Sequence, residues 1–171
     1  MDALLELGPE RVSTPRPKTK GKRTASGSAR TRAVRLLLCD DQRLIRMRLQ
    51  LLFHDLASVE VVGEAATGRE AIRLARELKP DLIIMDVSMP DLDGIEATRQ
   101  IAAQSAGVRV LAYSGNDDAE SMRKMFAAGA SGYVLKTSDP TQLLTAIQSV
   151  LNGRRFIGAQ SMQPRICFRH D

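Results

Sequence analysis

The sequence predicts an α/β fold in which helices cover both faces of a five-stranded parallel sheet. From Val34 onward, short apolar runs typical of strands alternate with segments in which apolar residues recur at helical spacing. The two kinds of segment follow each other five times in strict order, which is typical of parallel strands joined by helices. The first and third apolar runs contain almost no polar residue, as expected for central strands that are buried on both faces.

The five predicted strands are short, and polar residues follow most of them. They span residues 34–39, 59–65, 81–86, 108–113 and 131–136. The second strand carries Glu60 and Glu64 among its apolar residues, which indicates a position at the edge of the sheet. Because crossover connections between parallel strands are right-handed, these features favour the doubly wound strand order 2-1-3-4-5.

Five helices are predicted, one after each strand. They span residues 42–56, 68–79, 94–104, 117–128 and 140–151. In the first helix, Ile45 and Leu49 begin an apolar stripe that should face the sheet. Asp93 is placed to cap the third helix, Gly129 to end the fourth, and Pro140 to occupy the first turn of the fifth.

The chain of 171 residues is long enough for one domain with a hydrophobic core. We predict that residues 33–157 form this domain, between a disordered basic extension at residues 1–32 and a tail at residues 158–171. Residues 1–33 carry eight Lys or Arg against three Asp or Glu, so the whole net charge of +5 lies on this arm. Such an arm is either solvated without a partner or contacts nucleic acid or an acidic membrane surface.

Composition also bears on the compartment. No apolar run approaches the length of a membrane span, and the first residues lack the features of a secretory signal. The two cysteines, Cys39 and Cys167, do not suggest a disulfide framework. These features favour a cytoplasmic protein that is not held in a membrane.

Acidic side chains end two strands that the predicted order makes neighbours. Asp40 and Asp41 follow the first strand, and Asp86 ends the third. Because the carboxyl ends of parallel strands meet at one edge of the sheet, the three carboxylates should share a small rim. Two such charges about 4 Å apart repel by about 4 kcal/mol at an effective dielectric constant of about 20. A hard divalent cation such as Mg²⁺ relieves this repulsion most directly.

Two further polar groups are expected at the same rim. Ser114 follows the fourth strand and supplies a hydroxyl, and Lys136 ends the fifth and supplies an ammonium. A carboxylate between a metal and a lysine can accept a phosphoryl group, since phosphoryl transfer mainly requires positioning and charge neutralisation. Asp86 is the expected phosphoacceptor, because it alone of the three acids follows a long apolar strand and precedes a Pro-containing loop.

Four motifs give the sequence a close resemblance to a known family. They are LLLCDD, LIIMDVSMPDLDG, VLAYSG and GASGYVLK. In this order and spacing they resemble the signatures of two-component response-regulator receiver domains, the CheY-like family, over about residues 33–157. The resemblance implies a flavodoxin-like fold and a signalling phosphoacceptor rather than an enzyme that turns over a substrate.

The resemblance also implies a role for each acidic residue. Asp86 resembles the aspartate that is phosphorylated by a sensor histidine kinase or a phosphotransfer protein. Asp40 and Asp41 resemble the acidic pair that binds Mg²⁺, which Asp86 and the backbone carbonyl of Ser88 complete.

Three other positions match residues of the switch. Lys136 resembles the lysine that pairs with the phosphoryl group, and Ser114 resembles the hydroxyl that bonds one of its oxygens. Tyr133 resembles the aromatic residue that turns inward when the hydroxyl moves.

The segment LKTSDP resembles the class of receivers that usually carries a C-terminal LuxR-type helix-turn-helix. The fourteen residues after Ile157 are too few for that module, so we expect the chain to lack it. The expected output is therefore a contact with a downstream protein effector or a homodimer. A transcriptional regulator without its DNA-binding domain is one form of this, and nucleic acid would be reached only through the basic arm.

Two other functions remain as alternatives. A Mg²⁺-dependent phosphatase or phosphotransferase with an Asp nucleophile would use a similar site. Such enzymes usually need a second acid two residues after the nucleophile, and Ser88 occupies that position. A flavodoxin-like cofactor binder would need a Gly-rich loop after the first strand, where Asp40 and Asp41 stand instead.

Overall fold

The computed structural model describes residues 32–105 and 107–158 of the chain. The chain divides into two units, Met1–Arg30 and Thr31–Asp171, and all described residues belong to the second. Nearly all of the predicted basic extension and C-terminal tail therefore lies outside the described residues. Every helix in the described ranges is too short or too polar to cross a membrane.

One parallel sheet of six strands forms the centre of the domain. The strands are β1 (Val34–Cys39), β2 (Val59–Ala65), β3 (Leu82–Asp86), β4 (Arg109–Ser114), β5 (Gly132–Leu135) and β6 (Phe156–Ile157). Their order is β2-β1-β3-β4-β5-β6, so the predicted order 2-1-3-4-5 is confirmed, with β2 at one edge. The predicted number of strands was too low by one. Strand β6 pairs with Gly132 and Tyr133 of β5 over only two residues, too few to produce a periodic pattern in the sequence.

Five helices follow the first five strands, as predicted. They are α1 (Arg43–His54), α2 (Gly68–Leu78), α3 (Gly94–Gln104), α4 (Ala119–Ala128) and α5 (Pro140–Leu151). The side chain of Asp93 caps α3 by accepting a hydrogen bond from the backbone N–H of Glu96 at 2.8 Å. Helix α4 begins two residues later than predicted, because Asp118 is its capping residue, and Gly129 ends it in a left-handed conformation (φ 110°).

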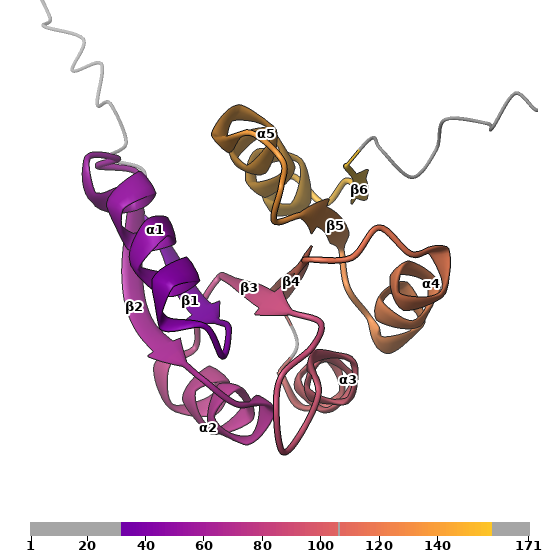
Figure 1. Cartoon of the computed structure of the whole chain (residues 1–171). Helices are drawn as coiled ribbons and strands as arrows, with labels where there is room; N and C mark the ends of the chain where they lie inside the picture. Colours follow the sequence, from indigo (N-terminus) through magenta and orange to yellow (C-terminus); the bar gives the residue numbers. More distant parts are fainter. Residues whose placement is uncertain (1–31, 106, 159–171) are drawn as a thin grey trace, which may run out of the picture. The chain divides into compact units, whose positions relative to one another are not determined.

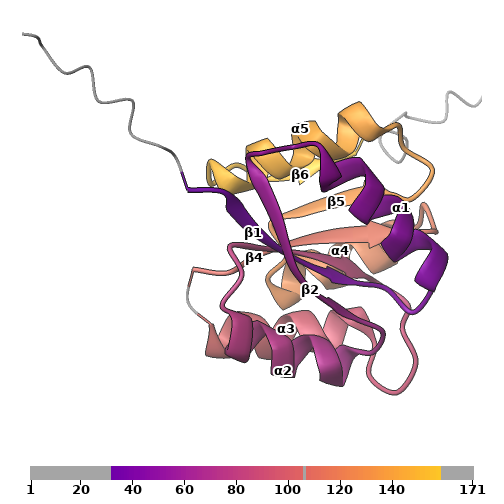
Figure 2. The same ribbon diagram turned by 90° about the vertical axis from the view of Figure 1, so that its left-hand side faces the viewer.

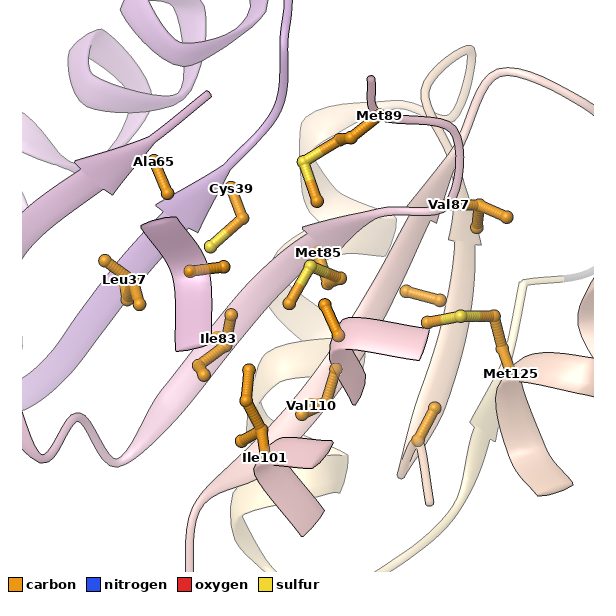
Figure 3. Close-up of a cluster of buried hydrophobic side chains, with 14 of the residues drawn as sticks. Leu37, Cys39, Ala65, Ile83, Met85, Val87, Met89, Ile101, Val110 and Met125 are labelled. Atoms are coloured by element: carbon orange, nitrogen blue, oxygen red, sulfur yellow. The ribbon is translucent and has the colours of Figure 1, made fainter. Parts of the chain in front are cut away.

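The helices form two layers, one on each face of the sheet (Figures 1 and 2). Helices α1 and α5 pack on one face, and α2, α3 and α4 pack on the other. Side chains alternate along β1, so that Leu36 faces the first layer and Leu37 the second. Figure 3 shows the core beneath α2, α3 and α4, where Ile101 and Met125 pack toward Met85 of β3.

Candidate functional site

Three carboxylates meet where β1 and β3 end. Asp40 and Asp41 directly follow β1, Asp86 is the last residue of β3, and these two strands are hydrogen-bonded neighbours. One carboxylate oxygen from each residue lies within 4.8 Å of the other two. Asp40 and Asp86 are buried, with 1% and 3% of their surface exposed, whereas Asp41 is exposed to solvent. The sequence therefore predicted this grouping correctly.

Lys136 bridges the two buried carboxylates. Its Nζ lies 2.6 Å from Oδ2 of Asp40 and 2.9 Å from Oδ2 of Asp86, and only 11% of its side chain is exposed. The position follows from the sheet, since the backbone N–H of Lys136 donates to the carbonyl of Ser114 at 2.7 Å as β5 runs beside β4. The lysine thus holds positive charge between two groups that would otherwise repel each other.

Backbone hydrogen bonds orient the two buried acids. The N–H of Gln42 donates to Oδ1 of Asp40 at 3.0 Å, and the N–H of Ser88 donates to Oδ1 of Asp86 at 3.2 Å. The other oxygen of Asp40, Oδ2, is buried and lies 2.6 Å from the ammonium of Lys136. A buried carboxylate oxygen of this kind, beside two more carboxylates, fits a hard cation such as Mg²⁺.

Burial and charge shift the protonation equilibria of the site. Burial raises the pKa of Asp86, and repulsion from Asp40 adds to this effect, while Lys136 opposes it without cancelling it. Burial would lower the pKa of Lys136, but its contacts with Asp40 and Asp86 outweigh burial and raise it. The ammonium therefore stays charged, and the ionised form of Asp86 is held at a cost in free energy.

This cost predicts that Asp86→Asn will make the Mg²⁺-free protein more stable than the wild type at neutral pH. A folded-state pKa above the unfolded value contributes stability below the unfolded pKa, and this contribution is lost as pH rises through the folded pKa. Asparagine cannot ionise, so the advantage of the variant should be present at about pH 7 and vanish near about pH 4. Urea unfolding in EDTA at both pH values measures it. A variant less stable than the wild type at neutral pH would contradict the raised pKa of Asp86.

The predicted switch residues lie next to this cluster but bond to a different group. Ser114 is buried at the end of β4, and its hydroxyl donates to the backbone carbonyl of Asn116 at 3.1 Å. Tyr133 is only 2% exposed, packs in the core with Met125, and donates from its hydroxyl to the same carbonyl at 3.0 Å. The hydroxyls of Ser114 and Tyr133 therefore share one acceptor, the carbonyl of Asn116. The sequence could not indicate this shared acceptor, because every residue has a backbone carbonyl.

Two glycines bring the loop after β3 against the starts of α2 and α3. The N–H of Gly94 donates to the carbonyl of Val87 at 3.0 Å, and the N–H of Gly68 donates to the carbonyl of Leu92 at 3.1 Å. A Cβ at Gly94 would lie 1.8 Å from the backbone oxygen of Asp86. The sequence shows an Asp-Gly pair here, but it does not reveal that the glycine contacts the backbone of the candidate phosphoacceptor.

Taken together, the fold and the cluster define a doubly wound α/β domain with an acidic, lysine-bridged site at the carboxyl ends of its strands. A family model described as "Response regulator receiver domain" matches residues 36–148, which is well over half of the chain. The chain belongs to this family, whose members are signalling phosphoacceptors of two-component systems. Its acidic pocket is the kind of site at which receiver domains are phosphorylated.

Curated relatives support the same assignment. The chain is 35% identical over 130 residues to "Response regulator UvrY" of Escherichia coli, an alignment that covers 76% of this chain and 60% of the relative. It is 38% identical over 120 residues to "Transcriptional regulatory protein LiaR" of Bacillus subtilis, covering 70% of this chain and 57% of the relative. The chain thus spans about 60% of the length of the curated relatives that it matches.

Solved structures agree in fold. A LuxR-family two-component response regulator from an Aurantimonas species superimposes with a TM-score of 0.72 at 40% identity, covering 75% of this chain and 92% of that chain. The receiver domain of the putative response regulator NarL from Mycobacterium tuberculosis gives a TM-score of 0.69 at 31% identity. This match covers 72% of this chain and 99% of that chain. A receiver domain implies a histidine kinase as its phosphodonor.

Proposed function

We propose that this domain is a phosphorylation-activated switch of a two-component phosphorelay, and that Asp86 is its phosphoacceptor. The observation that carries the proposal is the position of Asp86, with one carboxylate oxygen 2.9 Å from the ammonium of Lys136 and the carboxylates of Asp40 and Asp41 beside it. The phosphodonor is a sensor histidine kinase or a phosphotransfer protein. An oxygen of Asp86 forms a bond to phosphorus as the bond between phosphorus and the donor histidine breaks.

The remaining groups neutralise and orient the phosphoryl group. Asp40, Asp41, Asp86 and the backbone carbonyl of Ser88 would hold Mg²⁺, which supplies positive charge at the phosphoryl oxygens. Lys136 supplies a second positive charge from the end of β5, at the same edge of the sheet. The grouping of three carboxylates supports the metal assignment, because a divalent cation would offset their mutual repulsion.

Phosphorylation then acts on the loop after β4. It adds a charge of about −1.5 to −2 and three acceptor oxygens, which compete with the carbonyl of Asn116 for the hydroxyl of Ser114. Because Tyr133 also donates to that carbonyl, a shift of the loop would change or break the hydrogen bond that holds the Tyr133 ring. The surface formed by α4, β5 and α5 would thereby gain or lose affinity for a protein effector or for a second copy of the chain.

The cellular context is proposed on the same basis. The name of the relative LiaR supports a role in a transcriptional response regulator. A cytoplasmic setting is proposed because the two cysteines of the sequence do not suggest a disulfide framework.

Phosphorylation from a small donor tests the assignment. Incubated with acetyl phosphate and Mg²⁺, the wild-type protein should gain one hydroxylamine-labile phosphoryl group per chain, and EDTA should prevent this. Asp86→Asn should abolish the label, whereas Asp91→Asn, an exposed aspartate of the same loop, should retain it. Intact-mass spectrometry measures the incorporation. Label that persists in the Asp86 variant would refute the assignment.

The phosphatase alternative shares the nucleophile but not the second acid. Ser88 occupies the position two residues after Asp86, and its backbone N–H is bonded to the Asp86 carboxylate. A phosphatase would release phosphate continuously from a generic phosphoester, whereas a phosphoacceptor stops after about one equivalent. The absence of an acid at this position favours the phosphoacceptor.

A further inference from the structure

The two edges of the sheet differ in charge. The carboxyl-terminal edge holds the three acids of the candidate site and aspartates that cap α3, α4 and α5. By contrast, the segments that precede β4, β5 and β6 at the opposite edge, residues 105–108, 129–131 and 152–155, contain no acidic residue. The part of the amino-terminal edge formed by these three segments therefore carries positive charge without an acidic residue of its own.

A pocket of about 230 Å³ opens at this amino-terminal edge. We call it the arginine pocket, because Arg109, Arg154 and Arg155 line it and no acidic side chain does. Its remaining lining residues are Gly129, Ala130, Ser131, Val150 and Gly153, which are small or apolar. The three arginines come from the start of β4 and from the turn before β6, two segments that only the sheet brings together.

The three guanidinium groups lack the partners that other arginines have. Among the described residues, none of them forms an ion pair with a carboxylate. The larger hollow between α2 and α3 is different, because its Arg69 pairs with Asp91 and its Arg73 pairs with Glu77. The arginine pocket is thus the more anion-selective of these two hollows.

Local structure keeps the positive charge of the arginine pocket in place. The guanidinium of Arg155 stacks over the ring of Phe126, with its central carbon 5.4 Å from the ring centroid. The backbone N–H of Arg109 donates to the carbonyl of Asp81, but the carboxylate of Asp81 is occupied by the side chain of Arg32 and the N–H of Arg35. The carboxylate of Asp81 is therefore already paired and does not neutralise the arginine pocket.

We propose that the arginine pocket binds a phosphate of a nucleic-acid backbone. All three arginines are exposed, and single exposed charge contacts contribute less than about 1 kcal/mol, too little to retain a free phosphate ion. A polyanion gains in addition from counterion release at each neutralised phosphate. The sequence before Val34 adds eight further Lys or Arg, which suits an extended chain of phosphates. The folded domain, and not the arm alone, then contributes to binding.

An anionic membrane is the less favoured polyanion. Surface binding to lipid usually combines basic residues with exposed apolar side chains that enter the interface. Among the described residues, the large exposed apolar side chains are Leu44, Met47 and Leu51 of α1 and Ile157 of β6, and none of them lines the arginine pocket. The arginine pocket offers charged groups without apolar anchors, which suits contacts with backbone phosphates.

Binding of full-length protein to a fluorescent 20-base-pair DNA duplex of arbitrary sequence tests the proposal. Every variant keeps the arm, so a difference between variants reports the pocket. In Arg154→Gln/Arg155→Gln, affinity at low salt should fall by about tenfold, and the slope of log K against log salt should decrease by about 1.8. The matched control is Arg43→Gln/Arg48→Gln, which removes two exposed arginines of α1 and should change affinity by less than about twofold.

Three results would overturn the proposal: no measurable binding of the wild type, equal losses in the double variant and its control, or pocket-dependent binding to anionic vesicles but not to DNA. Because Arg155 packs on Phe126, urea unfolding should first establish that the double variant is folded. If it is not, Arg109→Gln is the test, and its salt slope should decrease by about 0.9. None of these measurements requires phosphorylation, so the outcome is independent of the role of Asp86.

Discussion

Lys136→Met will destabilise the Mg²⁺-free protein by about 3 kcal/mol, because it leaves two buried carboxylates without a counter-charge. Nζ of Lys136 lies within 2.9 Å of both Asp40 and Asp86, and those acids are almost fully buried. Breaking a buried ion pair usually costs about 3–5 kcal/mol. The expected loss is at the lower end of this range, since the side chain of Lys136 retains some contact with solvent. Urea unfolding in EDTA at neutral pH measures it.

The pH and metal dependence of this loss identify its cause. Lowering the pH should reduce the loss, because a carboxyl whose pKa is raised by burial becomes neutral more readily than it does in the unfolded chain. Millimolar Mg²⁺ should also restore part of the stability by replacing the missing charge. Lys124→Met removes an exposed lysine that pairs with Glu120 and should cost far less stability than Lys136→Met, because solvent screens exposed ion pairs. Equal losses in the two lysine variants would contradict the bridging role of Lys136.

Gly94→Ala will destabilise the protein by about 3 kcal/mol or more, because a methyl group has no room at the start of α3. The new Cβ would lie 1.8 Å from the backbone oxygen of Asp86 and 3.1 Å from Cα of Val87. Both neighbours are backbone atoms, so relief requires that the helix move away from the strand end or that Asp86 be displaced. Thermal and urea unfolding measure the loss.

The matched control for this variant is Gly115→Ala. Gly115 follows Ser114 in another loop of the same edge, and a Cβ there would meet no atom within 4 Å. This substitution should leave stability within about 1 kcal/mol of the wild type. Where Gly94→Ala remains folded, acetyl phosphate should label it more slowly than Gly115→Ala, because the displaced backbone belongs to Asp86, the proposed acceptor. Wild-type stability and labelling in Gly94→Ala would show that the close packing is not required.

Apolar patterning determined the order of the strands correctly. Strand β2 was predicted at an edge because Glu60 and Glu64 interrupt it, and Glu64 is partly exposed and pairs with Arg46 of α1 at 2.8 Å. A charged side chain in a central strand would have to be buried without water, which costs several kcal/mol unless it is paired. Charged residues are therefore rare in central strands, and their presence in β2 indicates an edge position.

The acidic cluster was predictable for a related reason. In a doubly wound sheet all strands run in one direction, so residues at their carboxyl ends meet once the strand order is known. The predicted neighbours Asp40, Asp41 and Asp86 are together, and Lys136 follows the end of β5 as expected. The second acid that a phosphatase would need was also visibly absent at Ser88.

Contacts between loops could not be predicted in this way. The shared bonds of Ser114 and Tyr133 to the carbonyl of Asn116 involve a backbone atom that carries no residue identity. The approach of Gly94 to Asp86 and the arginine pocket both depend on distances of a few ångströms between separate segments.

Residue types along the chain were thus sufficient to establish the alternation of strands and helices, their order in the sheet, and the gathering of acids at one edge. These properties follow from burial and from chain direction, which act on each segment separately. Folding in three dimensions decided that one lysine spans two carboxylates and that Tyr133 is packed inward. It also decided that three arginines with no ion-pair partner in the described ranges line a pocket at the opposite edge. Those contacts depend on the twist of the sheet and the packing of all five helices, which no single segment encodes.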